Sequence, residues 1–263
     1  MKQLSGKKIY FASDFHMGAP SFASSRKREL AIIAWLDRIS EDAQCIFLVG
    51  DIFDFWFEYK QVVPKGFVRL QGKIAALVDA GIDVYFFLGN HDMWMKNYFT
   101  KELGVTMITD ELELEVNGKN FFIAHGDGLG PGDHGYKFIK RIFRNKFCQF
   151  LFSCLHPRIG LSLAQYFSNK SRIHTGTKDD NYDGKDAEWL YQFSKEKLKS
   201  AQYDYFIFGH RHLPMDIQIS NSRYINLGEW MNYATFAYYD GENLSLKVWR
   251  DGDIEEFKGI QES

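Results

Sequence analysis

Short apolar runs alternate with longer amphipathic stretches along the first hundred residues of the chain. The runs KKIYFAS, CIFLVG and DVYFFLG are rich in β-branched and aromatic residues, which is typical of buried strands. Between them, apolar residues recur at intervals of three and four over Ser25–Ser40 and Gly66–Ala80, which predicts two helices. Strands that alternate with helices form βαβ units, so this part of the chain predicts a layered α/β fold.

After Gly104 the pattern changes to hairpins. LELEV and KNFFIAHG flank an Asn117-Gly118 turn, and TFAYY is joined to NLSLKVW through Asp240-Gly241. These dipeptides favour the tight turns that join antiparallel strands. We therefore expect a second, largely antiparallel sheet layer.

A long stretch between His125 and Tyr203 has helical periodicity and few strand signals, and it begins with the Gly-Pro-rich segment GDGLGPGDHG. We interpret residues 131–200 as an inserted helical cap. Residues 1–130 and 201–263 then form one core domain, which suits a chain of 263 residues.

Composition narrows the class of protein. The N-terminus has no secretion signal pattern, and no apolar window is long enough to span a bilayer without charges, so a cytoplasmic protein is expected. The three cysteines contain no C-x-x-C pair, which argues against a disulfide framework or a zinc-thiolate site. Aromatic residues are unusually frequent at 17%.

Five polar motifs follow apolar runs: SDFH at 13–16, GDIFD at 50–54, GNHD at 89–92, AHGD at 124–127 and GHRH at 209–212. Because the carboxyl ends of strands gather along one edge of an open α/β sheet, ligands far apart in sequence can converge there. Carboxylate, amide and imidazole groups together suit Mn²⁺, Fe²⁺ or Zn²⁺. Each motif alone carries little weight, since a lone histidine is usually a core residue, but the ordered set predicts a metal site.

The order D-x-H, G-D, G-N-H-D, H-G and G-H-x-H resembles the calcineurin-like metallophosphoesterases. The resemblance implies an α/β/β/α sandwich with two divalent ions. By this resemblance Asp14, His16 and His212 hold the first ion, while Asn90, His125 and His210 hold the second. Asp51 bridges both ions. Two ions about 3.5 to 4 Å apart can activate a water and neutralise phosphoryl oxygens for in-line attack.

His91 follows the expected ligand Asn90 in GNHD. We expect it to protonate the leaving oxygen or to contact the phosphate, with Asp92 fixing its tautomer. The alternative is that His91 only supports the site structurally.

The cap contains a block of basic charge in a chain whose net charge is −2. No Asp or Glu occurs in this block, and its basic residues are Lys137, Lys140, Arg141, Arg144, Lys146, Arg158, Lys170 and Arg172. In KFIKRIFRNKFCQFLF the basic residues recur at helical spacing beside phenylalanines, as in helices that lie on anionic membranes. An ordinary surface helix that packs on the core is the alternative.

GDIFDFW, the HGDGLGPGDHGYKFIKR segment and the cap together resemble the UDP-2,3-diacylglucosamine hydrolases of lipid A biosynthesis. That family cleaves a pyrophosphate bond, usually with Mn²⁺, and releases UMP and 2,3-diacylglucosamine 1-phosphate. The resemblance implies a lipid-linked UDP-sugar substrate and a peripheral position on the cytoplasmic face of the inner membrane.

The same resemblance places Asp133 and Tyr136 where the family contacts the sugar or nucleotide, and Lys170, Ser171 and Arg172 at a basic segment that contacts phosphate. One position departs from the pattern, because the best known branch of the family has Arg where this chain has His91.

Two other functions stay open at this stage. Another phosphodiesterase or nucleotide pyrophosphatase would use the same metal site, and a non-catalytic binding module would lack some of the ligands, none of which is missing here. A nucleic-acid substrate is not expected, because the chain is slightly acidic and its basic block lies among aromatic residues.

Overall fold

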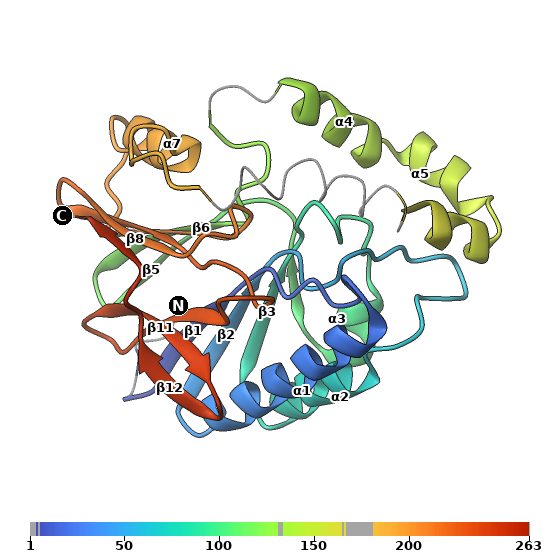
Figure 1. The fold of residues 1–263 in the computed structure, drawn as a ribbon, viewed down its shortest axis with the longest axis horizontal. Helices are drawn as coiled ribbons and strands as arrows, with labels where there is room; N and C mark the ends of the chain where they lie inside the picture. The colour runs from blue at the N-terminus through green and yellow to red at the C-terminus, as the bar shows by residue number, and fades with distance from the viewer. Residues whose placement is uncertain (1–3, 5, 131–133, 165, 167–180, 263) are drawn as a thin grey trace.

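The chain folds into two facing β-sheets with helices on their outer faces (Figure 1). The structure is a computed structural model that describes residue 4 and residues 6–130, 134–164, 166 and 181–262, with the side chains of 134–136 excluded. The expected α/β sandwich architecture is therefore confirmed.

The first sheet has seven strands in the order β12-β11-β10-β1-β2-β3-β4. Strands β1 to β4 are mutually parallel, and β10 joins them antiparallel to β1. Their bounds are β1 Lys8–Ala12, β2 Ala43–Val49, β3 Asp83–Phe87, β4 Thr106–Ile108, β10 Thr235–Tyr239, β11 Leu244–Arg250 and β12 Asp253–Glu256.

The second sheet has six strands in the order β13-β8-β9-β7-β6-β5. Their bounds are β5 Leu112–Val116, β6 Lys119–Ala124, β7 Tyr205–Phe208, β8 Met215–Ile219, β9 Ser222–Asn226 and β13 Ile260–Glu262.

The expectation of a largely antiparallel second layer is wrong. Three of the five pairings in the second sheet are parallel: β13 with β8, β6 with β7 and β7 with β9. The connection from β6 to β7 runs through the cap, and a long crossover permits parallel pairing. The β10–β11 hairpin lies in the first sheet, because a turn fixes which two strands pair but not which sheet they join.

Three helices cover the first sheet: α1 Phe22–Ile39, α2 Val68–Asp79 and the short α3 Tyr98–Leu103. The first two match the helices expected from periodicity to within three residues at each end. Ser21 begins α1 by accepting a hydrogen bond from the Ser24 backbone N–H at 3.2 Å, so this helix starts before the predicted Ser25.

Alternate side chains of β1 point into two different apolar layers. Tyr10 and Ala12 face the helices, whereas Ile9 and Phe11 face the second sheet. Phe11 stacks on Phe47 of β2 at 5.2 Å between ring centroids and contacts Phe121 of β6 at 6.3 Å. Much of the aromatic surplus in the composition thus fills the space between the sheets.

The described part of residues 131–200, the segment expected to form the cap, contains helices α4 His134–Arg144, α5 Lys146–Ser153 and α7 Trp189–Lys197, and residues 157–164 are also helical. Helix α7 packs on the second sheet, where Leu190 is fully buried among Phe122, Phe206 and Phe208. Helices α4 and α5 lie away from that sheet at the other end of the cap (Figure 1).

Candidate metal centre

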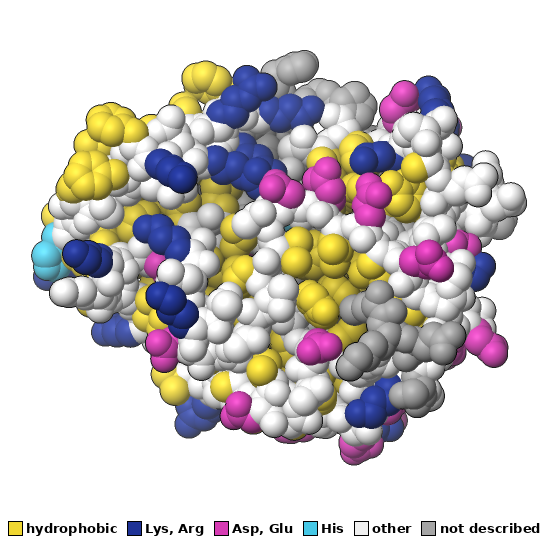
Figure 2. All heavy atoms as spheres, turned by 180° about the vertical axis from the view of Figure 1, so that it is seen from behind, with side chains coloured by type: hydrophobic (Ala, Val, Ile, Leu, Met, Phe, Trp, Pro, Cys, Tyr) yellow, Lys and Arg dark blue, Asp and Glu magenta, His cyan; other side chains and the backbone are white. Residues whose placement is uncertain are grey.

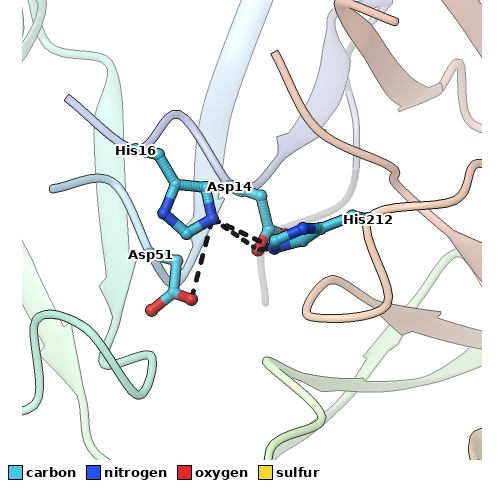
Figure 3. Close-up of side chains that lie close together, drawn as sticks. All are labelled: Asp14, His16, Asp51 and His212. Carbon is cyan, nitrogen blue, oxygen red and sulfur yellow. Dashed lines mark hydrogen bonds and ion pairs between the residues drawn. The ribbon is translucent and has the colours of Figure 1, made fainter. Parts of the chain in front are cut away.

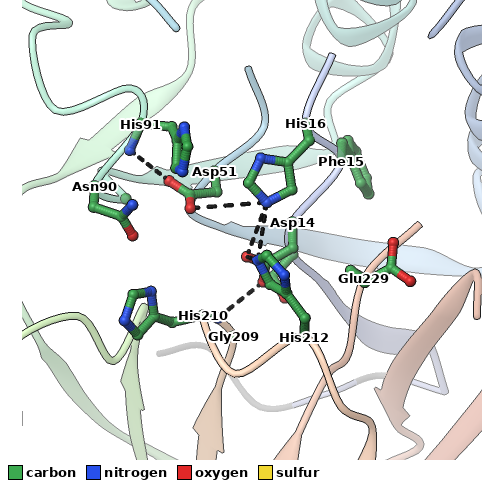
Figure 4. A network of polar contacts seen from close by, with 12 residues as sticks. Asp14, Phe15, His16, Asp51, Asn90, His91, Gly209, His210, His212 and Glu229 are labelled. Carbon is green, nitrogen blue, oxygen red and sulfur yellow. Dashed lines mark hydrogen bonds and ion pairs between the residues drawn. The ribbon is translucent and has the colours of Figure 1, made fainter. Parts of the chain in front are cut away.

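The five polar motifs lie at the carboxyl ends of five strands. SDFH, GDIFD and GNHD follow β1, β2 and β3 of the first sheet, while AHGD and GHRH follow β6 and β7 of the second. Within each sheet these strands run parallel, so their ends meet at one edge. The predicted ligands therefore converge from both sheets at this edge (Figure 4).

One group contains Asp14, His16, Asp51 and His212, with potential ligand atoms within 4.8 Å of one another (Figure 3). His16 Nε2 and His212 Nε2 lie 3.0 Å apart. Asp14 Oδ1 lies 3.2 Å from His212 Nε2 and 3.6 Å from His16 Nε2.

A second group contains Asp51, His125 and His210. His125 Nδ1 donates a hydrogen bond to the carbonyl oxygen of Val49 at 2.9 Å, so the lone pair of the neutral ring is on Nε2. That nitrogen lies 3.2 Å from Asn90 Oδ1 and 3.4 Å from Asp51 Oδ2.

Asp51 belongs to both groups and connects them. Its Oδ2 is 3.4 Å from His125 Nε2 and 3.9 Å from His16 Nε2, and its Oδ1 accepts a hydrogen bond from the His91 backbone N–H at 2.8 Å. Figure 4 shows Asn90 and His210 on one side of this carboxylate.

Backbone strain is concentrated at these positions. Among the described residues, ten non-glycine residues have a positive φ, and half of them are predicted ligands: Asp14, His16, Asp51, His210 and His212. This conformation costs on the order of 1–3 kcal/mol for a non-glycine residue and persists only where the surroundings enforce it. The strained backbone thus lowers the stability of the fold, and it orients these side chains.

Glycines in three motifs allow the strand ends to approach each other. A Cβ on Gly50 would overlap the His125 ring, one on Gly89 would overlap the Asp51 carboxylate, and one on Gly209 would overlap Asp14. Each glycine therefore makes room for a predicted ligand from a different strand, which gives a physical reason for the G-D, G-N-H and G-H patterns.

Burial and neighbouring charges set the protonation of the site. Burial lowers the pKa of His16 and of His210 to about 4, so both rings are neutral at pH 7. Burial alone would lower the pKa of His125, but the Asp51 carboxylate outweighs it and raises that pKa to about 10. Burial alone would raise the pKa of the Asp51 carboxyl. The nearby His125 and His91 rings outweigh burial and hold that pKa well below its usual range.

The donor set fits divalent cations. Asp14 Oδ1 is buried and accepts no hydrogen bond from any described residue. Two ligands of one ion that each lie about 2.1 Å from it at a right angle are about 3 Å apart, close to the His16–His212 separation. Neutral imidazoles, an amide oxygen and anionic carboxylates are ligands for Mn²⁺, Fe²⁺ or Zn²⁺.

His91 lies at the rim of the site. Its Nδ1 donates to the carbonyl oxygen of Asp54 at 2.9 Å, which leaves Nε2 as the atom that can meet a substrate. The expectation that Asp92 fixes this tautomer is wrong, because its Oδ1 accepts from Gly89 N and its Oδ2 from Ile52 N and Phe53 N. Asp92 instead ties the loops after β2 and β3 together.

Sequence reasoning missed two residues that hold the first motif. Arg28 of α1 is buried and donates to the carbonyl oxygens of Phe15, His16 and Ala19 at 2.6 to 2.7 Å. Asp54 Oδ1 lies 3.6 Å from both His16 Nδ1 and His91 Nδ1. A signal for Arg28 exists, since it lies on the buried face of α1 with Ile32 and Trp35.

The predicted substrate contacts fall largely outside the described residues. Asp133, Lys170, Ser171 and Arg172 belong to undescribed parts of the chain. Tyr136 lies in α4, but its side chain is likewise undescribed.

Three basic residues of the cap fasten α4 to the core. Lys140 pairs with Asp127 at 2.5 Å, Lys137 donates to the carbonyl oxygen of Gly130 at 2.6 Å, and Arg144 pairs with Asp110 at 2.8 Å. The basic block therefore serves in part as a structural attachment.

The two-sheet fold and the convergence of the predicted ligands indicate one class of protein, and comparison with known families agrees. Residues 7–214 match the family model described as calcineurin-like phosphoesterase, and the chain belongs to this family.

Its relatives include proteins named UDP-2,3-diacylglucosamine hydrolase. The chain is 40% identical to one from Porphyromonas gingivalis over 93% of this chain and 98% of the relative. It is 27% identical to one from Haemophilus influenzae over 89% of this chain and 95% of the relative. A Neisseria gonorrhoeae relative is also 27% identical, over 89% of this chain and 94% of its own length.

Proposed function

We propose that this chain is a two-metal hydrolase that cleaves the pyrophosphate bond of UDP-2,3-diacylglucosamine, releasing UMP and 2,3-diacylglucosamine 1-phosphate. The observation that carries the proposal is the likeness to the Porphyromonas gingivalis UDP-2,3-diacylglucosamine hydrolase along nearly the full length of both chains. The convergence of the motif side chains at one sheet edge supports the same chemistry.

In this proposal Asp14, His16 and His212 hold one divalent ion, and Asn90, His125 and His210 hold the other. Asp51 binds both, as the position of its Oδ2 between His16 and His125 suggests. Mn²⁺ is the proposed ion. When bound, such a pair lowers the pKa of a water and neutralises phosphoryl oxygens.

His91 is proposed to meet the phosphate or the leaving oxygen through Nε2. Since its Nδ1–H is held by the carbonyl oxygen of Asp54, a neutral ring can only accept at Nε2. Donation to a phosphate oxygen therefore requires the imidazolium form.

The acyl chains are proposed to associate with the cap. Most of the large exposed hydrophobic side chains of the described residues lie between positions 138 and 166, and Phe138, Phe147 and Phe150 are each more than 60% exposed. Figure 2 shows hydrophobic side chains gathered at the upper left, with Lys and Arg side chains beside them. Such a surface is unusual for a protein with no apolar partner.

An anionic membrane surface, at the cytoplasmic face of the inner membrane, is the proposed place of action. Arg141, Lys146 and Arg158 form no ion pair with any described residue, so their charges are available to lipid headgroups. None of the described helices is both long and apolar enough to cross a bilayer. Asp133, Tyr136, Lys170, Ser171 and Arg172 remain proposed contacts to the sugar, nucleotide or phosphate.

Release of UMP tests the proposal. The purified protein is stripped of metal by a chelator, dialysed, and incubated with UDP-2,3-diacylglucosamine in detergent micelles with or without Mn²⁺. We expect UMP and the acylated sugar phosphate in equal amounts, and only with the metal. Absence of UMP above the metal-free control would exclude this substrate, while its release without any divalent ion would exclude the metal mechanism.

A further inference from the structure

Arg211 is a buried charged residue between two predicted ligands, and the proposed reaction gives it no role. Its side chain is 5% exposed and forms a two-pronged ion pair with Glu188, whose side chain is 4% exposed. Arg211 Nε lies 3.0 Å from Glu188 Oε2, and Arg211 Nη2 lies 3.0 Å from Glu188 Oε1.

The backbone on either side of Arg211 is strained. The Arg211 N–H donates to the carbonyl oxygen of Gly209 at 2.7 Å, which closes a three-residue turn around His210 with φ of 64°. His212 follows with φ of 60°. Both imidazoles are therefore aimed by a backbone conformation that the chain does not favour by itself.

Two side chains from other strand ends hold the first part of this turn. The His210 N–H donates to Asp14 Oδ2 at 3.0 Å, and Asn226 Nδ2 donates to the Gly209 carbonyl oxygen at 2.7 Å. These two hydrogen bonds reach only Gly209 and His210. The side chains of Asp14 and Asn226 therefore do not support the part of the turn that leads to His212.

Arg211 connects the second part of the turn to helix α7. Glu188 is the N-cap residue of α7, and the first turn of that helix buries Leu190 against the second sheet. Arg211 Nη2 also donates to the Asn181 carbonyl oxygen at 2.6 Å, and the guanidinium lies 5.6 Å from the centre of the Trp189 ring. The guanidinium is thus fixed to a packed helix, which is a rigid support.

We propose that Arg211 is a positioning residue, which fixes the His210–His212 turn to α7 and thereby sets the affinity for divalent metal. The inference rests on the proposed metal centre. Because His210 and His212 serve different ions there, loss of the Arg211–Glu188 pair weakens the binding of both. Lysine cannot replace Arg211, since an ammonium lacks the planar fork that contacts both oxygens of Glu188.

Titration of the metal-free protein with MnCl₂, followed by electron paramagnetic resonance of free Mn²⁺, measures this directly. The main variant is Arg211→Met with Glu188→Met, because removing both buried charges avoids leaving one uncompensated. The control is Arg223→Met with Asp216→Met, which removes another two-pronged pair. This pair lies in the second sheet, between β9 and β8, with distances of 3.1 and 2.5 Å.

We expect the main variant to bind Mn²⁺ about 10- to 100-fold more weakly than the wild type, as when groups that orient metal ligands are lost. Its turnover should recover as the Mn²⁺ concentration is raised. The control pair should change thermal stability and leave the affinity for Mn²⁺ unaltered. A folded main variant with wild-type affinity at both ions overturns the inference.

Two single variants keep the test decisive if the main variant does not fold. Arg211→Lys and Glu188→Gln each retain part of the contact. Each should weaken Mn²⁺ binding by a smaller factor than the main variant does. Unchanged affinity in both also overturns the inference. The titration needs no substrate. A wild type that binds two ions but releases no UMP therefore refutes the proposed substrate and leaves this inference intact.

Discussion

Replacing Asp51 with asparagine perturbs the proposed bridge with the least change of shape. The side chain is 1% exposed, and its Oδ2 lies 3.4 Å from His125 Nε2 and 3.9 Å from His16 Nε2. Asp51→Asn keeps the size of the side chain and the acceptor for the His91 N–H, but it removes one negative charge from between the two ligand groups.

The size of the effect follows from Coulomb's law. A unit charge pair about 4 Å apart at an effective dielectric constant near 20 is worth about 4 kcal/mol. Because each 1.36 kcal/mol of activation free energy changes the rate tenfold, Asp51→Asn should lower kcat by about a thousandfold. A further loss is expected when Mn²⁺ is limiting, because the affinity for metal falls as well.

The same substitution has a signature that does not depend on turnover. The Asp51 carboxylate raises the pKa of His125 to about 10 against the opposing effect of burial, so that pKa should fall in the metal-free variant. Titration of the imidazole protons by NMR measures the change. Retention of more than a tenth of wild-type kcat at saturating Mn²⁺, with an unchanged pKa of His125, would refute the bridging role.

Three further variants test other parts of the site and cap. His91→Asn should lower kcat about 10²- to 10⁴-fold and leave Mn²⁺ affinity unchanged, as expected for a proton donor, and a loss of metal affinity would make it a ligand instead. Gly89→Ala introduces a Cβ against the Asp51 carboxylate, so Mn²⁺ binding measured by calorimetry should weaken; wild-type affinity would show that the loops can separate. Phe147→Ser with Phe150→Ser should reduce sedimentation with anionic vesicles while release of UMP from a water-soluble UDP-sugar is unaffected, and undiminished vesicle binding would contradict the membrane role of this surface.

The strands and their polar ends were predictable from local pattern. β1, β2 and β3 are short apolar runs that each end in a polar motif, and parallel strands must present those ends together. The helices α1 and α2 followed from their three- and four-residue periodicity. The composition of each strand and the polar motif after it therefore predicted a shared metal site, while the roles of individual ligands came from the resemblance to calcineurin-like metallophosphoesterases.

Long-range partners were not predictable in the same way. The hairpin turn at Asp240-Gly241 specifies that β10 pairs with β11, but nothing local indicates that β10 also pairs with β1. Arg211 looks like an ordinary surface charge in the sequence, and only the fold brings it to the Glu188 carboxylate. The spacing of Arg28 with Ile32 and Trp35 places it on the apolar face of a helix, but does not show that it binds the His16 carbonyl oxygen. The basic residues of α4 likewise gave the charge of the cap without revealing that Lys140 binds Asp127.

The ratio of kcat/KM for UDP-2,3-diacylglucosamine to that for UDP-glucosamine, both measured as UMP release with saturating Mn²⁺, tests the proposed function most directly. If the exposed apolar surface of the cap binds acyl chains, burying only four methylenes contributes about 3 kcal/mol, so the acylated substrate should be favoured at least about a hundredfold. Equal values for the two substrates would contradict the account and indicate a nucleotide-sugar pyrophosphatase that does not recognise lipid.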